Sequence, residues 1–168
     1  VVFLNRDDNH YNTVSVRHIL IKAEASEDGT YTDEAKAEAK ARAEEILAEF
    51  NSGDKTEDSF AALANEYSED DGSNTNGGLY EDIAKGQMVQ EFNDFCFAGH
   101  KAGDTGIVYG DNGSYAGYHV MYFVGEGEQY SDYLAKNSLL TSDMNAWLEE
   151  LTSAYETSVG GGIRFVGK

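Results

Sequence analysis

The first strongly patterned segment is Val14 to Lys22, where β-branched and apolar residues follow one another at the density of a buried strand. The polar stretch from Ala23 to Thr32 contains a glycine, which favours a loop. A long helix is then expected. Thr32 is placed to cap its first turn, and the alanine-rich run 35–50 has high helix propensity. Asn51-Ser52-Gly53 ends this predicted helix.

Two further helices are predicted in the middle of the chain. The residues from about Glu57 to Tyr67 carry apolar side chains at helical spacing, and so do those from Val89 to Phe97. Between them, Ser68 to Gly78 is dense in Ser, Asp, Asn and Gly, which predicts a loop. A short extended piece is expected around Leu79-Tyr80.

The next segments predict a β-hairpin. A strand is expected over Gly103–Tyr109 and a second, the most apolar of the chain, over Tyr118–Val124, with a turn at Asp111-Asn112-Gly113 between them. We expect a break from Gly125 to Tyr130. A helix is expected from there to about Ser158.

This order of elements predicts an α+β fold with an antiparallel sheet and a C-terminal helical extension. The 168 residues suit one domain with an appendage. We expect a domain over 14–126, an N-terminal segment 1–13, a C-terminal helix 130–158 and a tail 159–168. Because the chain begins at Val1, we interpret it as a mature or excised fragment of a longer chain.

The composition of the chain disfavours several classes of partner and site. The formal net charge is −19, which disfavours nucleic acids and anionic membranes as partners because their phosphates would be repelled. No apolar run approaches the roughly 20 residues that span a bilayer. A single cysteine, Cys96, excludes an internal disulfide, and its apolar neighbours predict a buried thiol. The chain contains no proline.

Two histidines are the most informative polar residues. His18 and His119 each lie in the apolar centre of a predicted strand. A single strand histidine is usually a packed residue with a hydrogen-bond partner, but two of them favour a shared site. Together with an aspartate they also match the ligand types of a facial metal triad, although the sequence lacks the spacings typical of one.

Several motifs in register carry a resemblance to a known family. They are Val16–Ile21, Phe60–Ala64, Tyr67–Asp70, Gly77–Tyr80, Gly86–Phe92, Gly103–Val108 and Gly117–Met121. In this order and spacing the chain resembles the parvulin-type (PpiC, rotamase) peptidyl-prolyl cis-trans isomerases over about 14–125, and among them the secreted bacterial foldases of the PrsA and SurA kind. The resemblance implies a four-stranded antiparallel sheet surrounded by helices.

The resemblance also implies a site without metal or cofactor. His18 and His119 match two histidines that hydrogen-bond each other, Asp70 matches a third position that holds cysteine or aspartate, and Ser114 falls where the family often has a hydroxyl. The proline ring of the substrate is expected to contact a second set of residues, which are Tyr80, Met88 and Phe92. An X-Pro amide needs only to be bound, desolvated and twisted, so no nucleophile is required.

Two departures from the family limit what is carried over. Phosphate-directed members have a basic cluster in the loop after the first strand, whereas here Ala23–Gly29 is acidic, so we expect no specificity for phosphorylated substrates. The usual Gly-Gly-x-Leu-Gly-Trp run appears as Gly77–Asp82, without the large aromatic residue and one glycine.

The expected function is therefore isomerisation of X-Pro amides in unfolded or partly folded exported polypeptides. The alternative is a catalytically weak parvulin domain that holds unfolded clients, which the C-terminal helix around Leu139 to Tyr155 favours, although that helix would also serve as a cap on the domain. The resemblance implies an exported, extracellular protein, with membrane anchoring through a segment outside this chain. The sequence leaves the oligomeric state open.

Overall fold

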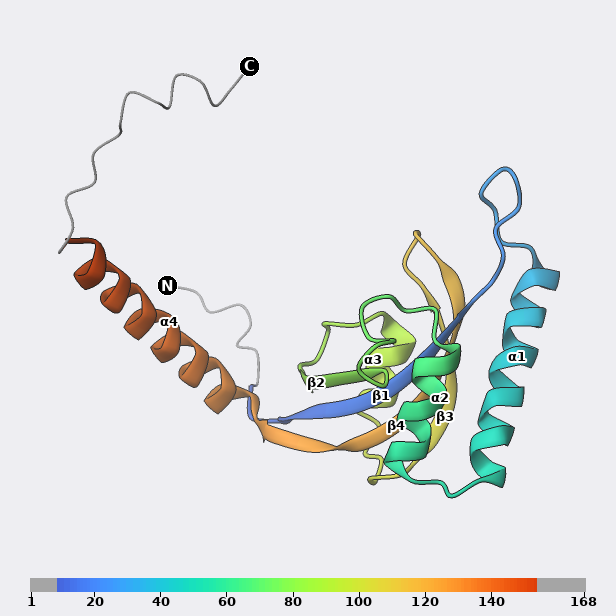
Figure 1. Cartoon of the computed structure of the whole chain (residues 1–168), viewed down its shortest axis with the longest axis horizontal. Coiled ribbons are helices and arrows are strands. Elements are labelled where there is room, and N and C mark those ends of the chain that lie inside the picture. The colour runs from blue at the N-terminus through green and yellow to red at the C-terminus, as the bar shows by residue number, and fades with distance from the viewer. Residues whose placement is uncertain (1–8, 154–168) are drawn as a thin grey trace, which may run out of the picture. The chain divides into compact units, whose positions relative to one another are not determined.

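A computed structural model of the chain describes residues 9–153 (Figure 1). The elements in chain order are β1 (Asn12–Lys22), α1 (Asp33–Ser52), α2 (Glu57–Tyr67), β2 (Leu79–Ile83), α3 (Gln90–Cys96), β3 (Thr105–Asp111), β4 (Ala116–Gln129) and α4 (Tyr130–Ser153). The strands form one antiparallel sheet in the order β2-β1-β4-β3. The predicted α+β class with a four-stranded antiparallel sheet is confirmed.

The two central strands, β1 and β4, divide the core into two parts because successive side chains of a strand point to opposite faces. On one face Ile19, Ile21 and Val120 pack with α1 and α2. On the other face Val16 and Met121 pack with α3. Figure 1 shows α1 and α2 together on one side of the sheet. The site described below lies on the α3 face.

Helix α1 begins where the sequence predicts. The Thr32 side chain accepts a hydrogen bond from the Ala35 backbone N–H, and Asp33 and Glu34 occupy the first turn, where the helix dipole favours negative charge. Its buried stripe consists of Ala39, Ala43, Ile46 and Phe50, spaced by three or four residues. Small alanines on this stripe let the helix approach the sheet closely.

The predicted break from Gly125 to Tyr130 is wrong, because β4 continues to Gln129 and α4 begins at Tyr130. The additional residues at the end of β4 pair with β1, where Asn12 is opposite Gln129. Gly127 has a steric role there: a Cβ at this position would collide with the Thr13 hydroxyl and lie 2.9 Å from an Asp82 carboxylate oxygen. This glycine marks close packing rather than a turn.

The described residues fall into two compact units, the first ending at Tyr130 and the second beginning at Ser131. In the second unit α4 has no buried residue, and its large apolar side chains, including Leu139 and Trp147, are exposed. None of the helices within residues 9–153 is both long and apolar enough to cross a membrane. The predicted end of this helix near Ser158 and the tail 159–168 lie outside the described residues.

One glycine beside the site makes a testable contribution to stability. Gly78 has a φ of +69°, and a Cβ there would collide with the backbone oxygen of His18. Gly29 has a similar φ of +80° but nothing within 4 Å. Gly29→Ala should therefore cost roughly 1–2 kcal/mol of unfolding free energy from backbone strain alone.

Gly78→Ala should cost clearly more than Gly29→Ala, because the backbone of β1 has to move in addition. Chemical denaturation of both variants measures the difference. Equal losses of unfolding free energy in the two variants would show that the close approach at Gly78 does not affect stability.

Candidate active site

The two strand histidines lie side by side on the α3 face of the sheet. Both are buried, with exposed fractions of 2% for His18 and 3% for His119. Their Nδ1 atoms are 3.0 Å apart, within hydrogen-bond distance. The register explains the contact: His18 is opposite Met121 and Leu20 is opposite His119, so the two histidines are diagonal neighbours on one face.

Asp70 approaches the same pair from the loop after α2. Its Oδ2 lies 3.0 Å from His18 Nε2 and accepts hydrogen bonds from the Ser73 hydroxyl at 2.5 Å and the Tyr80 hydroxyl at 3.0 Å. The structure thus brings together His18, His119 and Asp70, the three residues expected to form the network. It adds Ser73, which also lies 3.0 Å from His18 Nε2.

The loop 68–78 is held against β1 by hydrogen bonds at both of its ends, and these position Asp70. The Ser68 hydroxyl accepts from the Leu20 N–H, and the Glu69 N–H donates to the Leu20 carbonyl. At the other end of the loop, the His18 N–H donates to the Gly78 carbonyl at 2.9 Å. Both ends of the loop are therefore tied to β1 within two residues of each other, and the turn between them projects Asp70 at the His18 ring.

Hydrogen bonding keeps the Asp70 carboxyl ionised. The bond with His18, followed by those with Ser73 and Tyr80, outweighs the effect of partial burial and holds the pKa of Asp70 well below its usual range. Burial, reinforced by the negative charge of Asp70, raises the pKa of Tyr80 to about 12. The Tyr80 phenol therefore remains a hydrogen-bond donor at neutral pH.

His119 is uncharged in this setting. Burial is the main cause that lowers its pKa to about 3, with a further lowering by His18 and an opposing effect of Asp70. Its Nε2 faces the Tyr115 hydroxyl at 3.0 Å. Each ring nitrogen of the two histidines therefore has a hydrogen-bond partner within the protein. Among residues 9–153 no cluster of three or more His, Cys, Asp or Glu side chains is arranged to hold a metal ion.

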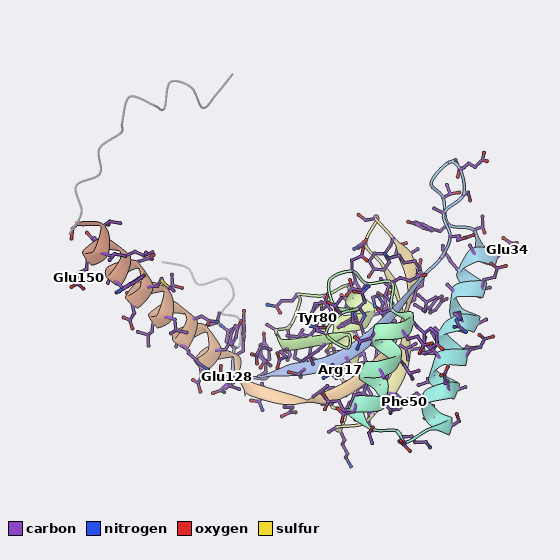
Figure 2. The ribbon with its side chains drawn as sticks, viewed as in Figure 1. Arg17, Glu34, Phe50, Tyr80, Glu128 and Glu150 are labelled. Atoms are coloured by element: carbon purple, nitrogen blue, oxygen red, sulfur yellow. The ribbon has the colours of Figure 1, made fainter. Side chains whose placement is uncertain are left out.

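A pocket of about 270 Å³ opens directly beside this network. Asp70, Tyr80 and the two histidines line one part of it, and Met88, Val89 and Phe92 line another. The Phe92 ring stands edge-on to both imidazoles, with centroid distances of 5.4 Å to His18 and 5.3 Å to His119. Figure 2 shows Tyr80 in the β2 strand near α3. All three residues expected to contact a proline ring thus line one pocket.

Ser114 is not brought into the network. It is exposed in the turn between β3 and β4, where its N–H donates to Asn112 and its carbonyl accepts from Tyr31. The hydroxyl that reaches His119 belongs to Tyr115 instead. Tyr115 immediately precedes β4 and is four residues from His119, a spacing that favours the same side of an extended chain, whereas Ser114 stays in the exposed turn.

Cys96 is fully buried on the α3 face, as expected. Burial raises the pKa of its thiol to about 12, so the reactive thiolate form is disfavoured at neutral pH. The cysteine is a core residue and lies outside the pocket lining.

Comparisons with known proteins agree with this geometry. A family profile described as the PPIC-type PPIase domain matches residues 3–122. The chain is 34% identical to a chaperone SurA of Chromohalobacter salexigens over 148 residues, covering 82% of this chain and 30% of that protein. It is 35% identical to foldase protein PrsA 3 of Bacillus cereus, covering 68% of this chain and 32% of that protein.

A solved structure supports the fold alone. The PPIase domain of TbPar42 superposes with a TM-score of 0.50 at 22% identity, covering 66% of this chain and 98% of that one.

The chain belongs to the PPIC-type peptidyl-prolyl isomerase (parvulin) family, since the family profile covers well over half of the chain. It spans about a third of the length of the SurA and PrsA relatives.

The buried neutral His119 predicts a pH dependence of stability. Between pH 6.5, the ordinary pKa of histidine, and about pH 3, the unfolded chain binds a proton at His119 that the folded chain does not. Unfolding is therefore favoured as pH falls through this window, by up to about 1.4 kcal/mol per pH unit.

His119→Asn removes this proton uptake, so its unfolding free energy should fall less steeply from pH 6.5 to pH 5 than that of the wild-type chain. A His100→Asn variant, at a partly exposed site, serves as the control and should keep the contribution of His119. Denaturant unfolding at a series of pH values measures the slopes. Parallel slopes for His119→Asn and the wild type would contradict a neutral His119 in the fold.

Proposed function

We propose that this chain catalyses cis-trans isomerisation of X-Pro amides, with Asp70, His18 and His119 forming the polar side of the site and Met88 and Phe92 its apolar wall. The observation that carries the proposal is the juxtaposition of a buried, hydrogen-bonded histidine pair with an apolar pocket. Family membership supports the same activity. Neither a covalent intermediate nor a cofactor is needed, because only rotation about the C–N bond takes place.

The chemistry follows from the electronic structure of the amide. Resonance makes the planar amide strongly dipolar, with negative charge on its oxygen, and it produces a rotation barrier of about 18–20 kcal/mol. An apolar wall strips water from this dipole and so favours the twisted state, in which the oxygen carries less charge. Met88, Val89 and Phe92 supply that wall.

Asp70 adds an electrostatic contribution to the same effect. It is the one acidic side chain among the pocket-lining residues, and its side chain is 22% exposed. Its negative charge raises the energy of a planar carbonyl oxygen placed nearby more than that of a twisted one. The donors His18, Ser73 and Tyr80 hold the carboxylate in place.

The proposed substrates are unfolded or partly folded exported polypeptides that contain proline. The acidic stretch Glu24–Asp28 near the end of β1 disfavours a phosphorylated residue before the proline, which supports the absence of phospho-specificity. Export, and anchoring to a membrane through a segment outside this chain, is proposed from the resemblance to secreted foldases.

The central test is the Asp70→Ala variant. It removes the acceptor of four hydrogen bonds, from His18, Ser73, Tyr80 and the Gly72 N–H, and hydrogen bonds to charged groups are worth about 1.5–3 kcal/mol. We expect kcat/KM for an X-Pro peptide to fall roughly tenfold to a hundredfold. The matched control is Asp71→Ala, which removes an exposed neighbouring carboxylate and should leave turnover unchanged. Unchanged turnover in Asp70→Ala would refute the assignment of Asp70.

A second candidate function is the holding of unfolded clients, and the exposed apolar side chains of α4 favour it. A His18→Ala, His119→Ala double variant should lose isomerase activity yet still suppress aggregation of a model client if α4 does the holding. Leu140→Lys combined with Trp147→Lys should show the reverse, because both changes lie on α4 and outside the pocket. Light scattering and a peptide assay measure the two activities. Loss of both activities in the histidine variant would instead tie holding to the pocket.

A further inference from the structure

Within residues 9–153, Tyr115 is the one tyrosine whose hydroxyl contacts the histidine pair on the side away from Asp70. Its hydroxyl lies 3.0 Å from His119 Nε2, and the two ring centroids are 5.8 Å apart. The side chain is half-buried and lines the pocket. Burial and the negative charges of Asp70 and Asp111 raise the pKa of its phenol, so the hydroxyl keeps its proton at neutral pH.

The contacts define a single chain of hydrogen bonds. It runs from Tyr115 through His119 Nε2 and Nδ1, across to His18 Nδ1 and Nε2, and ends at Asp70. Asp70 is ionised and accepts only, and the Ser73 hydroxyl donates to Asp70 at 2.5 Å. His18 Nε2 therefore faces two acceptors and must carry a proton.

The donor and acceptor in each remaining hydrogen bond can be assigned by starting from the Asp70 end of the chain. When the only proton on the His18 ring is on Nε2, its Nδ1 presents a lone pair, and His119 Nδ1 donates to it. A neutral His119 then has a lone pair on Nε2, and the Tyr115 O–H must donate to that lone pair. With these two tautomers every link donates toward the carboxylate, an arrangement in which successive bonds polarise and strengthen one another.

The turn between β3 and β4 is built so that the phenol reaches this place. The Asn112 side-chain oxygen accepts from the Tyr115 N–H at 3.2 Å, and the Asn112 N–H donates to the Tyr115 carbonyl at 3.3 Å. On the neighbouring strand, Gly110 leaves room for the rings. A Cβ there would lie 2.5 Å from His119 Nε2 and 3.4 Å from the Tyr115 hydroxyl.

We propose that Tyr115 is a positioning residue whose hydroxyl donates to His119 Nε2 and so holds both imidazoles in one pair of tautomers, with protons on His119 Nδ1 and His18 Nε2. Without this donor, His119 is free to carry its proton on Nε2, and the Nδ1–Nδ1 bond to His18 then loses its hydrogen. The expected effect on turnover rests on the proposed isomerase function. The assignment of the two tautomers does not depend on that function.

The first test is spectroscopic and needs no activity. Long-range ¹H–¹⁵N correlation spectra of the imidazoles show which ring nitrogen carries the proton. We expect protonated Nδ1 on His119 and protonated Nε2 on His18 in the wild-type chain at neutral pH. In Tyr115→Phe, which removes only the hydroxyl, we expect a second His119 tautomer with protonated Nε2 to appear.

Tyr118→Phe is the matched control. Tyr118 is also half-buried and lies on the opposite face of β4, where its ring packs on Tyr109, 5.3 Å away between centroids. Its variant should leave the imidazole spectra unchanged. A wild-type His119 with its proton on Nε2 would overturn the proposal, and so would a Tyr115→Phe spectrum identical to that of the wild type.

The second test is kinetic. Loss of one hydrogen bond predicts a fall in kcat/KM of about twofold to tenfold for Tyr115→Phe. Gly110→Ala should produce a loss as well, because it displaces His119 while retaining the phenol. Tyr118→Phe should turn over at the wild-type rate. Thermal unfolding of each variant checks that the loss does not come from unfolding.

The two tests separate the two proposals. A wild-type chain with the expected tautomers but no isomerase activity would refute the proposed function and leave the role of Tyr115 in the network intact. An active wild-type chain whose Tyr115→Phe variant keeps full turnover and a single His119 tautomer would refute the role of Tyr115 alone.

Discussion

The pairing register of β1 with β4 is the constraint on which the site depends. It sets His18 opposite Met121 and His119 opposite Leu20, so the two imidazoles become diagonal neighbours on one face. A slip of one residue in either strand would turn one imidazole to the α1 side of the sheet and expose part of its apolar set. Two buried polar rings without partners would cost several kcal/mol, so the bond between them also favours this register over its alternatives.

The rest of the polar network is attached to that pair by two loops of different origin. The loop after α2 brings Asp70 and Ser73, and the turn before β4 brings Tyr115. Glycines at the points of closest approach, Gly78 and Gly110, make this possible because any side chain there would strike a histidine. The described residues contain no buried side-chain polar atom without a partner, so the network is complete within the protein.

The two faces of the sheet have different roles, since one carries a closed core and the other carries the pocket. On the α1 and α2 face, the rings of Phe50, Phe60 and Tyr122 pack edge-on or tilted in a buried apolar core that contributes stability. On the α3 face the core is open at one end, and Phe92 belongs both to the core and to the pocket wall. Because Phe92 is also held in the core, we expect this wall of the pocket to be formed in the free protein, which would lower the entropic cost of binding.

The local features of this fold could be predicted because they depend on neighbours in the sequence. Thr32 and the alanine-rich run specify α1, and the apolar density of Val14–Lys22 specifies β1. The even spacing of Tyr115 and His119 also favours one side for both residues, although Tyr115 lies just before β4 and the resemblance directed attention to Ser114. The continuation of β4 through Gly125 was not predictable locally, because those residues become a strand only when β1 supplies the hydrogen bonds.

Only the tertiary structure decided which of these residues meet. Asp70 and His18 are separated by 52 positions, and His18 and His119 by 101. Contacts over such separations depend on sheet register and on how a loop is tied down, neither of which a local pattern records. By itself the sequence determined most of the helices and strands and the family, whereas the meeting of His18, His119 and Asp70 was decided by the packed fold, since it depends on distances and burial that exist only there.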